Sequence, residues 1–171
     1  MKYLALFAAL VLPLSAHAAG GGDETAPSAP KCEKGQVYDK TSKTCVDADS
    51  ATDPDLLYDT VRRLAYAGRL DEAQDMLALM PPRDDRRLTY LGFTHRKLGR
   101  TGTARVYYRA ALAANPDNIL ARSYMAQGFV EAGRVADAIA ELREIRARGG
   151  AGSWAEASLR TAIATGRTFD Y

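Results

Sequence analysis

The sequence contains few of the residues that usually carry catalysis or bind metals. It has 2 cysteines and 2 histidines among 171 residues. A zinc site needs further ligands at regular spacing, and the Cys-X-X-Cys spacing of redox sites does not occur. A nucleophilic site needs a positioned histidine beside an exposed nucleophile, whereas His95 falls in the core of a predicted helix pair. We therefore expect no metal, no cofactor and no enzyme activity.

A strong charge of either sign is also missing. The 23 basic residues nearly balance the 21 acidic residues, which leaves a formal net charge of +2. This balance argues against binding of nucleic acid. Lysine is scarce in the C-terminal part, where residues 54–171 hold 17 arginines and only Lys97. These arginines either cover solvated helix faces or line a surface for carboxylates or phosphates.

The apolar run at the N-terminus is too short for a transmembrane helix. Residues 3–14 are apolar and include Pro13, whereas a spanning helix needs about 20 apolar residues. A lysine precedes the run, and residues 16–18 have the small-x-small form found before a cleavage site. We expect residues 1–18 to be a cleaved signal peptide. The mature chain would then be periplasmic or secreted, without insertion into the membrane.

The segment that follows differs in composition from the rest of the chain. Residues 19–31 are rich in glycine and proline and have too few apolar residues to form a core, so we expect a flexible tether. The two cysteines, Cys32 and Cys45, come next. In an oxidising compartment this pair predicts a disulfide that closes residues 32–46 and contributes about 3 kcal/mol.

The closed loop has the pattern of a hairpin. Residues 37–38 and 44–46 are the expected strands, and residues 39–43 the expected turn. An aromatic residue, Tyr38, lies between the two cysteines, as in the small cysteine loops of carbohydrate-binding modules. Binding of peptidoglycan or another glycan by this loop is therefore an alternative to a purely structural role.

A glycine followed by an arginine recurs at nearly constant spacing along the remaining chain. The glycines are Gly68, Gly99, Gly133 and Gly166, separated by 31, 34 and 33 residues. Apolar residues between them recur every three or four positions, which is typical of amphipathic helices, and glycine commonly ends a helix. A period in the low thirties made of two helices predicts stacked helix pairs. The predicted helices cover 54–67, 70–80, 84 or 85 to 98, 101–114, 117–132, 135–148 and 153–165.

The middle unit resembles the tetratricopeptide repeat. The matching residues are Leu91, Gly92, Ala104, Tyr108, Ala111 and Pro116. The first unit is three residues shorter and has Val61 at a small-residue position, and the third has Arg122 where the family often has tryptophan or leucine. The resemblance covers residues 54–166. It implies an all-α fold, a right-handed superhelix of about three helix pairs with a C-terminal capping helix, preceded by the disulfide-closed hairpin.

The resemblance also implies a concave groove lined by the first helix of each pair. Helical phase places a mixture of aromatic and cationic side chains on the groove side of these helices. Such a mixture is suited to an extended peptide or its terminal carboxylate, although the same residues could be ordinary solvated or packing residues. The predicted groove residues are Tyr58, Arg62, Arg86, Thr89, Phe93, Arg96, Lys97, Ser123, Gln127 and Glu131.

These features predict an exported protein-interaction scaffold. The chain resembles envelope proteins of this family in bacteria, whose partners are proteins or peptides. The alternative function is that of a peptidoglycan- or glycan-binding envelope protein that uses the loop between Cys32 and Cys45.

Overall fold

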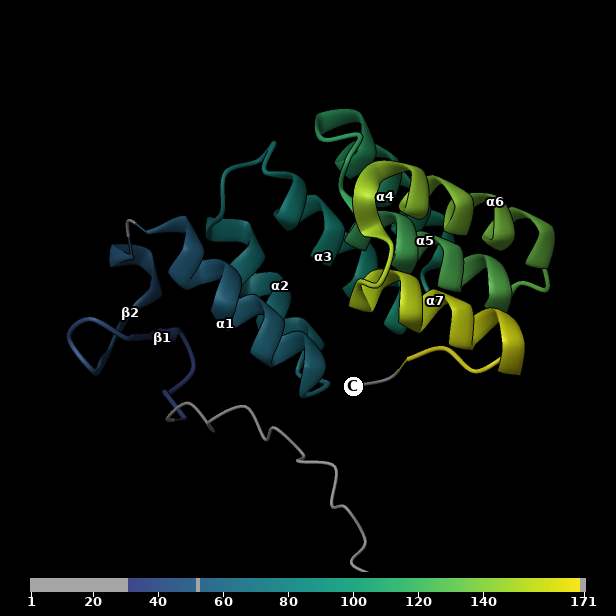
Figure 1. Cartoon of the computed structure of the whole chain (residues 1–171). Coiled ribbons are helices and arrows are strands. Elements are labelled where there is room, and N and C mark those ends of the chain that lie inside the picture. The colour runs from purple at the N-terminus through teal and green to yellow at the C-terminus, as the bar shows by residue number, and fades with distance from the viewer. Residues whose placement is uncertain (1–30, 52, 170–171) are drawn as a thin grey trace, which may run out of the picture.

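The computed structural model describes residues 31–51 and 53–169, which form a small hairpin followed by helices (Figure 1). The predicted signal peptide, 1–18, lies outside the described residues, as does the predicted tether apart from Lys31. Among the residues described, no helix is both long and apolar enough to cross a membrane.

The hairpin has the predicted strands and the predicted disulfide. Strand β1 (Gln36–Asp39) pairs antiparallel with β2 (Thr44–Asp47), and Cys32 is bonded to Cys45. The Asp39 carboxylate accepts hydrogen bonds from two backbone N–H groups of the turn, which fixes the reversal of the chain. Val37 is fully buried and belongs to the core of the first helices, so the hairpin is packed onto the helical domain.

Seven α-helices follow in the described part of the chain, in agreement with the prediction of an all-α domain. A short 3₁₀ turn, η1 (Ala48–Ser50), precedes them. Side chains of Asp53, Asp84, Asn118 and Ser153 accept backbone N–H groups at four helix starts, which satisfies donors that have no partner within the helix. The helices are α1 (Pro54–Tyr66), α2 (Leu70–Leu79), α3 (Asp85–Lys97), α4 (Thr101–Ala114), α5 (Ile119–Glu131), α6 (Val135–Ile145) and α7 (Trp154–Thr165).

The recurring glycine has the same structural role in each pair. Gly68, Gly99 and Gly133 have φ between 72° and 74°, a left-handed conformation that favours glycine. After Gly68 the N–H of the following arginine donates to the Leu64 carbonyl at 2.9 Å, and the other two glycines are followed by equivalent bonds. This Schellman arrangement ends the first helix and turns the chain into the second. The repeated glycine in the sequence therefore corresponds to the C-terminal cap of the first helix in each pair.

The helices stack as antiparallel pairs. Within each pair, α1 packs against α2, α3 against α4, and α5 against α6. The first helices also pack against one another in the order α1, α3, α5 and α7, and we call these four helices the first-helix layer. Figure 1 shows the second helices behind or beside this layer, with α7 next to α5 and α6. The right-handed superhelical curvature stays a prediction.

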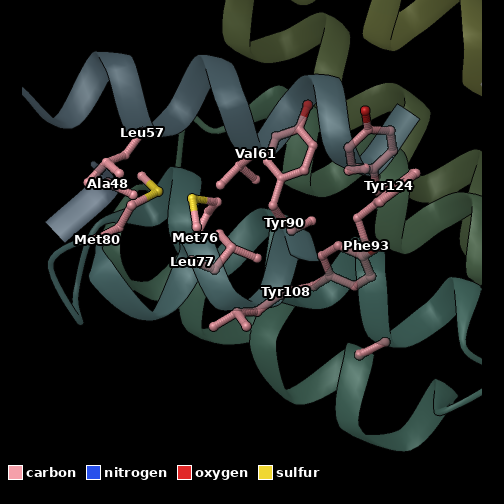
Figure 2. Packing of buried hydrophobic residues seen from close by; sticks show 14 of the residues in the cluster. Ala48, Leu57, Val61, Met76, Leu77, Met80, Tyr90, Phe93, Tyr108 and Tyr124 are labelled. Atoms are coloured by element: carbon pink, nitrogen blue, oxygen red, sulfur yellow. The ribbon is translucent and has the colours of Figure 1, made fainter. Parts of the chain in front are cut away.

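The core of the first two pairs is rich in tyrosine (Figure 2). Tyr90, Tyr108 and Tyr124 are each at most 1% exposed. The ring of Tyr108, from α4, lies over Gly92 of α3 so closely that a Cβ on this glycine would be 2.5 Å from two ring carbons. The small residue recognised in the sequence is therefore the point at which these two helices make contact.

The link between α6 and α7 departs from the prediction. We expected a helix over 135–148, whereas α6 ends at Ile145 and a five-residue π-turn, η2 (Arg146–Gly150), follows. The Glu156 carboxylate then accepts the N–H of Gly152 and the Nε–H of Arg146, each at 2.7 Å. This acid ties the link to the first turn of α7.

The contact between Gly92 and Tyr108 yields a stability prediction. Gly92→Ala places a methyl group against the buried Tyr108 ring, so we expect a loss of about 1 to 3 kcal/mol and a lower thermal midpoint. The control is Gly102→Ala in α4, where an added Cβ meets no atom within 4 Å. A thermal midpoint that falls equally in both variants would contradict this packing.

The contacts of Glu156 yield a pH prediction. The Gly152 N–H and then Arg146 lower the pKa of this carboxyl below its ordinary value of 4.5, so its contribution to stability is complete above that value and is lost as the pH falls through the lower folded pKa. The thermal midpoint of Glu156→Gln should therefore lie below that of the wild type at neutral pH. The difference should shrink in acid. An exposed glutamate, Glu33→Gln, serves as control, and a gap that is independent of pH would contradict the prediction.

Candidate functional site

An aromatic chain runs through the first-helix layer from one end to the other. Each ring comes from the next helix of the layer, and the last ring belongs to the C-terminal segment. The ring centroids are 5.7 Å apart between Tyr58 and Tyr90, 6.1 Å between Tyr90 and Tyr124, 6.0 Å between Tyr124 and Trp154, and 5.9 Å between Trp154 and Phe169. All four contacts are edge to face, the arrangement that aromatic pairs favour.

Three tyrosine hydroxyls join this chain across three helices. The hydroxyl of Tyr66, in α1, is 2.6 Å from that of Tyr90 and 2.9 Å from that of Tyr124. Figure 2 shows the hydroxyls of Tyr90 and Tyr124 pointing to the same side. Burial raises the pKa of Tyr90 far above its ordinary value, so the hydroxyl keeps its proton. These hydroxyl contacts link α1, α3 and α5.

Cationic side chains lie over these rings. The guanidinium carbon of exposed Arg62 is 5.8 Å from the ring centre of Tyr58 and 5.9 Å from that of Tyr66. Arg86 lies 4.9 Å from the ring of Tyr58 and is ion-paired with Asp55 at 2.6 Å and with Asp84 at 3.0 Å. The prediction of aromatic and cationic residues side by side thus holds for α1 and the start of α3.

A hollow of about 240 Å³ opens where α3 and α5 begin. Tyr58, Arg86 and Thr89, three of the predicted groove residues, contribute to its wall. The Asp85 carboxylate, on the same wall, accepts hydrogen bonds from the side-chain amides of Asn115 at 2.8 Å and Asn118 at 2.7 Å. The sequence analysis did not single out these polar residues, because they fall at or next to the ends of predicted helices.

Five predicted groove residues do not face solvent. Exposed fractions of these residues are 5% or less, so they are buried in the described structure and not open to solvent, and Gln127 accepts a hydrogen bond from the C-terminal segment. Three of them lie on α3, which packs against α1, α2, α4 and α5, and the other two lie on α5, which packs against α3, α4, α6 and α7. Whether the remaining predicted residues bind a partner stays a prediction. The buried residues are Thr89, Phe93, Arg96, Ser123 and Gln127.

Lys97 and Glu131 lie at the ends of their helices, where the layer reaches solvent. Lys97 is half-buried with its ammonium nitrogen 5.8 Å from the centre of the Phe93 ring, and burial lowers its pKa. Glu131 is exposed, and its carboxylate forms an ion pair with the buried guanidinium of Arg96. This pair bridges α3 and α5.

The C-terminal segment, residues 167–169, returns to the first-helix layer. The Thr168 hydroxyl donates to the Glu131 carboxylate at 2.6 Å, and the backbone N–H of Phe169 donates to the side-chain oxygen of Gln127 at 3.1 Å. Figure 1 shows the segment leaving the end of α7 and running back along the layer. A hydrophilic chain end carries no periodic pattern, so the sequence analysis could not place it.

Comparison with known families agrees with this geometry. Residues 95–163, which extend from the end of α3 into α7, match the model of a family described as tetratricopeptide repeat. Over residues 95–163 the chain is thus similar to tetratricopeptide repeats. Domains of this family generally mediate protein–protein interaction and generally act as non-catalytic scaffolds. Neither the curated proteins nor the solved structures gave a match.

The three-tyrosine contact in these repeats yields a prediction. Tyr66→Phe removes the hydroxyl between two buried hydroxyls, so we expect a loss of about 1 to 3 kcal/mol in unfolding free energy. The control is Tyr38→Phe in the hairpin, outside the aromatic chain. Chemical denaturation measures both variants, and equal midpoints for Tyr66→Phe and the wild type would refute the bridging role of this hydroxyl.

Proposed function

We propose that the chain is an exported scaffold of the bacterial cell envelope that binds an extended segment of a partner protein along its first-helix layer. One observation carries this proposal. The chain's own residues 167–169 bind to this layer through backbone and side-chain contacts at once. The general role of tetratricopeptide repeats in protein–protein interaction supports the same conclusion.

The contacts of the C-terminal segment indicate how an extended partner is held. Gln127 accepts a backbone N–H, a bond that any non-proline residue can supply. Glu131 accepts a side-chain hydroxyl, and the Trp154 indole, 41% exposed, contacts an aromatic ring. The layer thus combines a contact that is independent of sequence with two that select side chains. Exposed Arg62, at the opposite end, adds attraction for acidic groups.

Export is supported by the cysteine chemistry. A structural disulfide such as that between Cys32 and Cys45 is typical of proteins in oxidising compartments. Cleavage of the predicted signal peptide, 1–18, would place the mature chain in the periplasm or outside the cell. Neither nucleic acid nor membrane insertion is part of the proposal.

Glycan binding by the cysteine loop remains the alternative. The structure gives this loop a packing role, because Val37 is fully buried in the core and Tyr38 is half-buried. These contacts do not favour a sugar-binding site over a structural role for the loop, so glycan binding is tested separately.

Photocrosslinking in the exported full-length chain tests the proposal. A photoreactive residue replaces Arg62 on the first-helix layer or Val106, 65% exposed on α4, as the matched control. We expect a defined covalent adduct with a partner protein at the first position and none at the second. The charge reversal Arg62→Glu should weaken recovery of this partner about tenfold or more, unlike Arg109→Glu on α4.

Adducts of equal yield at Arg62 and Val106 would contradict binding by the first-helix layer. The alternative is tested in parallel by sedimentation of the purified chain with peptidoglycan. Sedimentation that is lost in Tyr38→Ala and retained in Arg62→Glu would favour the glycan-binding function.

A further inference from the structure

A second cavity lies between α3, α4 and α5, and it shares only Glu131 with the contacts of the proposed function. Its volume is about 230 Å³. The wall combines apolar side chains with an unusual group of buried polar atoms. The residues on it are Arg96, Thr101, Ala104, Arg105, Tyr108, Met125, Gly128, Phe129, Glu131, Ala132 and Arg134.

Arg96 presents an unused edge of its guanidinium to this cavity. The side chain is 2% exposed, and its Nη1 forms the ion pair with Glu131. Its Nε and Nη2 are buried and have no hydrogen-bond partner among the described residues. These two nitrogens form the edge of the guanidinium that binds a carboxylate with two parallel hydrogen bonds.

Tyr108 presents a second unused donor to the same cavity. The residue is 1% exposed, and its hydroxyl lies beside the Arg96 guanidinium, but it has no hydrogen bond of regular geometry within the described part of the chain. Burial raises the pKa of this hydroxyl to about 12, although the nearby Arg96 charge opposes the rise. The group therefore keeps its proton at neutral pH and is available to donate it in a hydrogen bond.

The charges and the apolar wall define the kind of ligand. The charged lining consists of three arginines, Arg96, Arg105 and Arg134, and one acid, Glu131. Arg134 lies over the Phe129 ring at 4.6 Å and is ion-paired with Asp137 at 2.7 Å. Met125 and Phe129 supply an apolar wall, which suits the hydrocarbon part of an acid better than inorganic phosphate.

A glycine opposite Arg96 leaves space for its side chain. Gly128 of α5 faces this side chain, and a Cβ there would be 3.2 Å from the Arg96 Cδ. Buried donors without partners are unfavourable in a packed core, and a ligand that accepts their hydrogen bonds removes that penalty. Three such donors converge on one cavity here.

We propose that this cavity binds a small organic carboxylate, with the acid on Arg96 and Tyr108 and its short apolar part against Met125 and Phe129. A carboxylate of this size occupies the space between a first helix, its partner and the next unit. Binding would therefore hold the second and third helix pairs together.

Titration of the full-length chain with isovalerate tests the site, with two-dimensional NMR and thermal midpoint as readouts. The neutral isostere isovaleramide and inorganic phosphate serve as comparison ligands. We expect isovalerate to shift backbone resonances around the cavity and to raise the thermal midpoint, with weaker effects from both comparison ligands. Equal effects of the amide or of phosphate, or none from isovalerate, would overturn the carboxylate site.

Two variants assign the binding to these residues. Tyr108→Phe and Arg96→Lys should each weaken isovalerate binding about tenfold or more, whereas the neighbouring Tyr107→Phe should leave it unchanged. Without ligand, Tyr108→Phe should be as stable as the wild type or more stable, because it removes a buried hydroxyl that has no partner. Unchanged isovalerate binding in Tyr108→Phe would overturn the proposal, even if Arg96→Lys failed to fold.

Discussion

The structure depends on the packing of Tyr90 at the centre of the first-helix layer. Its ring contacts aromatic rings from α1, α3 and α5, and its hydroxyl bonds to that of Tyr66. No helix pair of this type buries its apolar face alone, so the contact that joins successive first helices is the one that makes separate pairs into a domain. The position of Arg62 over Tyr58 and Tyr66 follows from this packing.

The same packing explains which surface is left for partners. Because α3 is surrounded by four helices, most of its side chains belong to the core, so in the proposed function a partner would contact the ends and rims of the layer. Glu131 and Trp154, at that rim, are exposed and hold the C-terminal segment. Few side chains of the first-helix layer are therefore accessible to a partner.

Local signals in the sequence were sufficient to predict where most of the helices begin and end. Asp53 caps α1 by accepting the N–H of Asp55 at 2.9 Å, and Gly68 ends that helix, as their residue types predict. Which residues are buried was harder to predict. Helical phase identifies one apolar face, whereas Phe93 and Gln127 lie on helices that are packed on several sides. The return of residues 167–169 depends on long-range hydrogen bonds, which leave no periodic trace.

The hairpin has a consequence for assembly. Val37 and Ala48 belong to the same core as Leu57 and Met80, so the disulfide-bonded module covers the end of the first helix pair. Helix α7 packs on α5 and α6 at the other end. The last unit of a repeat stack exposes an apolar face onto which further copies can add. Terminal elements that cover this face prevent such addition. In the described residues the hairpin thus covers one end of the helical stack, and α7 covers the other.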